Sequence, residues 1–190
     1  MNIMKKTTLQ VVIVLLLAGC ATHQQICQQA FYERASALPS IDGSAVGCAG
    51  SPGESYTLAN ELVITRDLSM FENMVQHTNK YVRAVGLLCL AAYMPKTESK
   101  IAELYRDPET IDVHYFGCTG IPLHTVGVFA QRLVESEGFR FCLVAPVGID
   151  SNHVTTVLRE YLSRPDDDRI YLKRTVEQLE KNESQQRVPR

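Results

Sequence analysis

Three side chains in one predicted loop carry the donor atoms of a metal site. His114, Cys118 and His124 are close in the sequence, and no predicted helix separates them. Imidazole nitrogen and thiolate sulfur at such separations could wrap a single transition-metal ion. A loop histidine is more often solvated, and an exported cysteine is more often oxidised. Structural roles for these three residues are therefore the preferred interpretation, with a metal site as the alternative.

No other pattern in the sequence predicts catalysis. The chain lacks a nucleophile elbow, a phosphate-binding glycine loop, a zinc-protease helix, a dinucleotide-binding fingerprint and a Cys-x-x-Cys pair. The acidic run Asp166-Asp167-Asp168 lies at a predicted helix start, where the helix dipole alone explains it. We therefore expect no catalytic residues, no enzymatic activity and no bound cofactor.

The N-terminal residues carry the most specific pattern in the chain. Lys5 and Lys6 precede an apolar run over residues 11–17 that is too short to span a bilayer, and Leu17-Ala18-Gly19-Cys20 follows. This segment resembles the signal peptide and lipobox of bacterial lipoproteins. The resemblance implies cleavage of residues 1–19, with a diacylglycerol and an N-acyl chain on Cys20. A plain secretory signal peptide and a buried helix are the alternatives.

The same resemblance implies a location. In Gram-negative lipoproteins, an Asp after the lipidated cysteine favours the inner membrane, whereas this chain has Ala21. We therefore expect an outer-membrane protein, lipid-anchored and facing the periplasm. Removing residues 1–19 leaves 17 basic and 21 acidic side chains, a net charge of −4. Nucleic acid and electrostatic docking on anionic lipid both require a basic surface, so neither is expected.

Five cysteines remain once Cys20 is assigned to the anchor. Translocated proteins sit in an oxidising compartment, so disulfides are the default expectation, and an odd number leaves one thiol over. Proximity in the sequence suggests Cys27–Cys48 and Cys118–Cys142. Cys89 lies in an apolar run, where a thiol acts as a small buried hydrophobe, and it is the candidate for the free cysteine. Cys89–Cys118 is a rival pairing.

The spacing of apolar residues predicts an all-α protein with six or seven helices. It forms either an irregular helical bundle or a short HEAT-like repeat, as a single domain over residues 20–182 with a flexible polar tail over 183–190. The predicted helices cover residues 21–36, 69–76, 80–93, 97–105, 125–137, 151–162 and 165–181, and residues 57–65 are a candidate for a further short helix.

Capping residues and breakers set the expected boundaries. Ser69 with Glu72 three residues later predicts a capping box. Thr97 and Thr125 are expected to cap later helices, and Gly138 to end the helix that Thr125 begins. Residues 39–53 and 107–124 are predicted loops. The alternating segment 139–144 predicts an isolated extended stretch.

The segment over residues 67–93 resembles one HEAT repeat. Tyr81-Val82-Arg83-Ala84-Val85 places a Val-Arg pair at the start of the second helix, which faces the core in that family. The resemblance covers one repeat and implies antiparallel packing of two helices. No fixed period recurs along the rest of the chain.

The C-terminal part resembles the end of small periplasmic immunity proteins, which neutralise toxins delivered by type VI secretion. The resemblance rests on Phe141-Cys142, on residues 146–149 and on the helix ending at Tyr161-Leu162-Ser163-Arg164-Pro165. This chain departs from that family by its lipid anchor and by lacking a final cysteine.

Three functions follow as hypotheses. The first is a membrane-anchored lipoprotein without enzymatic activity that binds another protein of the envelope, because helical grooves suit such binding. The second is an immunity or protective protein against a periplasmic toxin. The third is an envelope enzyme or ligand carrier that uses the loop 107–124.

Overall fold

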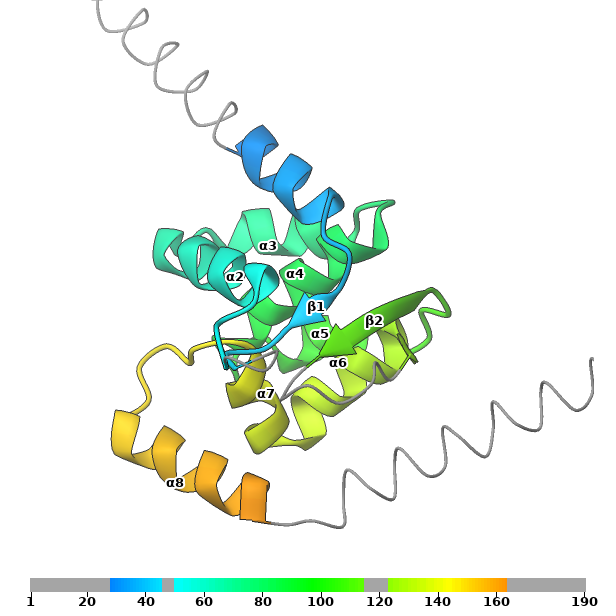
Figure 1. The fold of residues 1–190 in the computed structure, drawn as a ribbon. Coiled ribbons are helices and arrows are strands. Elements are labelled where there is room, and N and C mark those ends of the chain that lie inside the picture. The colour runs from blue at the N-terminus through cyan, green and yellow to red at the C-terminus, as the bar shows by residue number, and fades with distance from the viewer. Residues whose placement is uncertain (1–27, 46–49, 115–122, 164–190) are drawn as a thin grey trace, which may run out of the picture.

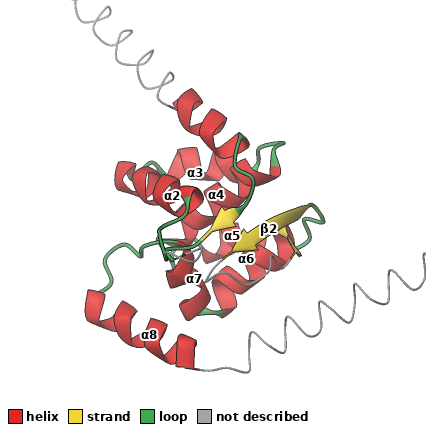
Figure 2. Cartoon of the chain, in the orientation of Figure 1, coloured by secondary structure: helices red, strands yellow, loops and turns green. Residues whose placement is uncertain are grey.

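The computed structural model describes residues 28–45, 50–114 and 123–163. Within these residues the chain is mostly helical, with a small sheet beside the helices (Figure 2). The predicted helical character is therefore confirmed, but an exclusively helical fold is wrong because three short strands pair with one another. The predicted helix over 165–181 and the tail over 183–190 lie outside the described residues.

Helix α4 (Lys80–Ala91) forms the centre of the core. Every residue from Val82 to Ala91 is buried, and the helix packs against α2, α3, α5, α6 and α7. Asn79 caps its start, because its side-chain oxygen accepts the backbone N–H groups of Tyr81 and Val82. The helix ends shortly before Pro95, as the sequence predicts.

Three helices lie at the N-terminal end of the described chain, and two of them, α2 and α3, pack on α4 (Figure 1). They are the helix over residues 28–36, called here the N-terminal helix, α2 (Glu54–Thr65) and α3 (Leu68–Val75). The predicted capping box at Ser69 is wrong, because Asp67 is the N-cap of α3 and accepts the backbone N–H of Met70 at 3.0 Å. The Ser69 hydroxyl instead donates to the Asp67 carboxylate.

Helices α5 (Glu98–Ala102) and α6 (Val126–Glu135) lie on the other side of α4. Thr125 caps α6 as predicted, since its hydroxyl accepts the backbone N–H of Val128. Thr97 occupies the N-cap position of α5, but its hydroxyl donates to the carbonyl of Leu90. Thr97 therefore joins α5 to the end of α4 instead of capping its own helix.

The small sheet is built from β1 (Ile41–Asp42), β2 (Thr110–His114) and β3 (Leu123–Thr125), in the order β1-β2-β3. β1 and β2 are parallel, and β2 and β3 are antiparallel. The prediction that residues 39–53 and 107–124 are loops is wrong at these strands. Ile111 and Val113 alternate with polar residues and face the core, which is the pattern of a half-buried strand.

Two helices complete the described chain, α7 (Glu137–Leu143) and α8 (Ser151–Ser163). The predicted extended stretch over 139–144 is wrong, because Ser136 caps α7 by accepting the backbone N–H of Phe139. The prediction that Gly138 ends a helix is also wrong, since α6 stops at Glu135 and Gly138 lies within α7. Helix α8 packs on α7, at the opposite end of the molecule from the N-terminal helix (Figure 1).

Candidate functional site

The two histidines of the predicted metal site lie on neighbouring strands but on opposite faces. His124 pairs with Ile111 and is buried, and Ile111 faces the core. His114 lies three residues after Ile111 on β2, so its side chain projects from the other face. The structure therefore does not bring the two imidazoles together. Cys118 lies outside the described residues, within which no group of three His, Cys, Asp or Glu side chains could hold a metal ion.

The predicted disulfides fall mostly outside the described residues, which omit Cys20, Cys27, Cys48 and Cys118. Both suggested pairings stay predictions, and Cys142 is buried at the end of α7.

Cys89 carries a free thiol within α4, as its apolar surroundings predict. Its Sγ lies 3.9 Å from the carbonyl oxygen of Ala59, and complete burial raises its pKa. A buried neutral thiol of this kind packs as a small hydrophobe and is a poor nucleophile.

His114 forms a hydrogen-bonded pair with Asp42 at the end of the sheet. The parallel register of β1 and β2 places the two residues opposite each other, with Nδ1 of His114 2.8 Å from Oδ1 of Asp42. The hydroxyl of Ser40 donates to the same carboxylate oxygen at 2.8 Å. When Nδ1 donates to a carboxylate, Nε2 is left as an acceptor, which is the arrangement of a general base.

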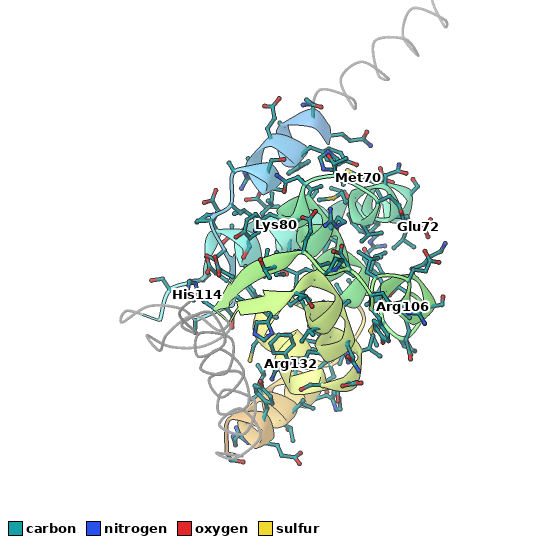
Figure 3. All side chains as sticks on the ribbon, turned by 90° about the vertical axis from the view of Figure 1, so that its right-hand side faces the viewer. Met70, Glu72, Lys80, Arg106, His114 and Arg132 are labelled. Carbon is teal, nitrogen blue, oxygen red and sulfur yellow. The ribbon has the colours of Figure 1, made fainter. Side chains whose placement is uncertain are left out.

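The backbone of Asp42 is held by Ser55 and Gly53. The backbone N–H of Asp42 donates to the Ser55 hydroxyl, which in turn donates to the Asp42 carbonyl. Gly53 packs so closely that an added Cβ would lie 2.0 Å from the Asp42 Cβ. The position of Asp42 is thus fixed from two sides. Figure 3 shows His114 well away from Glu72 of α3, so this pair is separate from the α3 region.

Arg83, from the Val-Arg pair of the HEAT-like segment, has a structural role. Its guanidinium is mostly buried and donates to the backbone carbonyls of His77 and Thr78 and to the Asp107 carboxylate at 2.7 Å. The carboxylate of Glu109 lies 3.2 Å away. These contacts join the turn before α4 to the segment that enters β2. Arg83 therefore stabilises the fold.

A shallow open groove of about 600 Å³ runs beside the N-terminal helix. Its lining residues come from that helix and from the turn between α3 and α4: Gln29, Tyr32, Glu33, Ser36, Ala37 and His77. The rings of Tyr32 and His77 are tilted, with centroids 5.4 Å apart. The side-chain amide of Gln29 donates to the carboxylate of Glu33 at 3.0 Å. The groove therefore presents two aromatic rings beside an exposed, oriented carboxylate.

Asp67 holds the N-terminal helix and this groove in place. Its Oδ2 accepts the side-chain amide of Gln28 at 3.3 Å, while Oδ1 caps α3. The hydrogen bond from Met70 and then that from Ser69 lower the pKa of the Asp67 carboxyl. Burial, and next the negative charge of Asp67, raise the pKa of the Tyr32 hydroxyl. Asp67 is therefore ionised at neutral pH and Tyr32 is neutral.

Sequence reasoning missed both the groove and the Asp42–His114 pair. The groove joins Tyr32 to His77, and the pair joins Asp42 to His114, so neither is a local motif. The one usable signal was the alternation around Ile111 and Val113, which would have placed His114 on the outer face of a strand.

No family model matches this chain, and no curated protein matches it in sequence. Among the described residues, no helix is both long and apolar enough to cross a membrane.

Proposed function

We propose that this chain is a lipid-anchored protein of the bacterial envelope that binds another protein, without enzymatic activity. The groove beside the N-terminal helix, lined by Tyr32, Glu33 and His77, supports the proposal that the chain binds a protein. The anchor rests on Leu17-Ala18-Gly19-Cys20, which precedes that helix in the sequence. The anchor would keep the groove close to the outer membrane, facing the periplasm.

The groove chemistry suits a peptide segment with a cationic or aromatic side chain. Tyr32 and His77 offer ring faces, and the Glu33 carboxylate is oriented by Gln29. Aromatic side chains are enriched among the residues that dominate binding energy, and a cation over a ring gains further attraction. An open groove also admits an extended segment without rearrangement of the helices.

The anchor is tested by expressing the full chain and its Cys20→Ala variant in a Gram-negative host. We expect incorporation of labelled palmitate and flotation with outer-membrane vesicles for the natural chain, with both lost in Cys20→Ala. An Ala21→Asp variant should remain lipidated but move to the inner-membrane fraction. Equal membrane association of the natural chain and Cys20→Ala would refute a lipid anchor at this residue.

The groove is tested by a photo-crosslinking amino acid placed at Ser36, with a matched control at the exposed Thr155 of α8. We expect a discrete adduct at Ser36, none at Thr155, and loss of the Ser36 adduct on Glu33→Lys. Glu33 is exposed, so its substitution should leave the fold unchanged. An adduct that survives Glu33→Lys, or that forms equally at both positions, would refute binding in the groove. An imported toxin as the captured protein would favour the immunity hypothesis.

The Asp42–His114 pair favours one alternative, an envelope enzyme or ligand carrier that uses the region 107–124. Its support is the 2.8 Å contact between His114 Nδ1 and Asp42 Oδ1, which would orient a general base. Screening the purified chain and His114→Gln against ester, amide and glycan substrates tests this hypothesis. A turnover present in the natural chain and absent in His114→Gln would support it.

A further inference from the structure

The turn between α2 and α3 exposes two large apolar side chains. Ile64, near the end of α2, is 79% exposed, and Leu68, the first residue of α3, is 41% exposed. We call residues 64–68 the α2–α3 corner. Among the described residues, the other large exposed apolar side chains are Tyr105 and Val147, which lie elsewhere in the chain. These two exposed apolar residues, four positions apart, make the corner a candidate contact surface.

Arg66 gives this corner a strained backbone conformation, and two backbone hydrogen bonds fix it. Arg66 has a φ of 58° in the left-handed region, where glycine is the usual residue. Its backbone N–H donates to the Val63 carbonyl at 3.2 Å, and its own carbonyl accepts the Leu68 N–H at 3.1 Å. Arg66 itself is exposed and stands between Ile64 and Leu68 in the sequence. A long cationic side chain next to apolar residues in the sequence can lay its stem on an apolar phase and keep its charge in water.

The corner lies beside the start of the N-terminal helix. The Gln28 side chain donates to Asp67, a residue of the corner, at 3.3 Å. Gln28 comes eight residues after Cys20, and eight residues span at most roughly 29 Å when fully extended. Figure 1 shows α2 and α3 close to the N-terminal helix, and in Figure 3 Met70 and Glu72 of α3 lie nearer that helix than Arg132 of α6 does. The corner is therefore within reach of any bilayer that holds Cys20.

From this placement, we infer that the α2–α3 corner contacts the bilayer that anchors Cys20. Ile64 and Leu68 enter the headgroup region, and the Arg66 guanidinium meets the lipid phosphates. This inference rests on the proposed lipid anchor and specifies how the domain sits on its membrane. With Cys20 and the corner both at the surface, the domain has one preferred orientation, and the groove lined by Tyr32 and His77 lies beside the bilayer.

The contact depends on apolar burial more than on net charge. Glu61, Asp67 and Glu72 lie in or near the corner, so it is not a polybasic surface. Attraction to anionic lipid by charge requires clusters of Lys and Arg, whereas insertion of apolar side chains does not. We therefore expect the contact to persist in moderate salt and in vesicles with little anionic lipid.

The absence of tryptophan from the sequence allows a direct test. The full lipidated chain is prepared with either Ile64→Trp or Val147→Trp and reconstituted into vesicles of phosphatidylethanolamine and phosphatidylglycerol, with or without acyl-chain-brominated lipid. Val147 is the matched control because it is an exposed apolar residue in the segment between α7 and α8. Flotation of each preparation with the vesicles is recorded first.

We expect brominated lipid to quench the Ile64→Trp emission at least about twofold more than the Val147→Trp emission, with a blue shift only for Ile64→Trp. Flotation without preferential quenching at position 64 would overturn the membrane contact while leaving the lipid anchor intact. Failure to float would overturn both. A blue shift of Ile64→Trp that grows with protein concentration in detergent alone would instead identify a second copy as the occupant and overturn the membrane contact.

Discussion

The two ends of the molecule are attached to the central helix α4 in different ways. At the N-terminal end, α2 and α3 pack directly on α4, and side-chain contacts such as Gln28–Asp67 and Arg34–Glu61 join the N-terminal helix to them. At the other end, α8 packs mainly on α7, and none of its described side chains is fully buried. Direct packing on a buried helix couples an element to global unfolding, whereas peripheral packing permits local opening. The N-terminal end is therefore the rigid part, and it carries both the groove and the corner.

The largest expected effect comes from Leu88→Ala, which removes a fully buried side chain from α4. Loss of apolar burial and the resulting cavity should lower the free energy of unfolding by about 3 kcal/mol, measured by denaturant titration. Both ends should lose hydrogen-exchange protection together. Ile64→Ala, at an exposed position, is the control and should change stability by less than about 0.5 kcal/mol. A Leu88→Ala variant as stable as this control would contradict the central role of α4.

The next largest effect comes from Gly138→Ala and is confined to the packing of α8 on α7. An added Cβ would lie 2.4 Å from Tyr161 Cβ, so α8 must shift away from α7. We expect a loss of about 2 kcal/mol in the docking of α8, seen as faster amide exchange in α8 with little change in α3. Because Tyr161→Gly removes both the Cβ and the ring that the new methyl group would meet, the double variant should cost less than the sum of the two single variants. Additive costs would show that the Gly138–Tyr161 contact does not position α8.

A smaller effect is expected at the N-terminal end from Asp67→Ala. This substitution removes the cap of α3 and the acceptor for Gln28, and loss of an N-cap typically costs about 1 kcal/mol. Ser69→Ala is the matched control, because Ser69 only donates to the Asp67 carboxylate. Thermal unfolding of both variants distinguishes the two capping arrangements. A greater loss for Ser69→Ala than for Asp67→Ala would restore the capping box predicted from the sequence.

Asp67 also predicts how this end responds to acid. Its pKa in the folded chain is lowered, so the unfolded chain binds the proton more tightly. The stabilisation is therefore complete above about pH 5 and is lost as the pH falls through the folded pKa. Amide exchange at Met70 should rise under those acidic conditions, and the rise should be absent in Asp67→Asn. Exchange at Met70 that is independent of pH after correction for the intrinsic rate would contradict this role.

The smallest expected effect is an increase in stability from Arg66→Gly. Glycine adopts the left-handed conformation without a steric penalty, so the substitution should raise the free energy of unfolding by about 0.5 kcal/mol. Arg66→Ala retains the strain and serves as the control. If Arg66→Gly were less stable than Arg66→Ala in denaturant titrations, the corner would not be strained at this residue.

Much of the helical part could be predicted because its signals are local. Asn79 precedes the buried run of α4, and Thr125 caps α6 through a hydrogen bond three residues ahead. The sheet was missed because β1 has two residues and exists only through its pairing with β2, far along the chain. The alternating apolar residues of 139–144 indicated a strand, but the cap at Ser136 and burial on both faces produced α7.

The groove and the Asp42–His114 pair could not be predicted for the same reason. Each joins residues that only the tertiary fold brings together, and neither follows a spacing that a local pattern would reveal. The predicted metal site failed to assemble from its two described members because alternation along paired strands placed His114 and His124 on opposite faces. The pairing of β2 with β3 thus also determined that the side chains of His114 and His124 could not meet.

The proposal of a lipid-anchored protein is tested most directly by the intact mass of the chain purified from membranes. We predict a mature protein that begins at Cys20 and carries the mass of a diacylglycerol and an N-acyl chain, with tandem fragmentation placing both on that residue. A mature chain without lipid, or one that begins at another residue, would contradict the anchor and the membrane contact of the α2–α3 corner that depends on it.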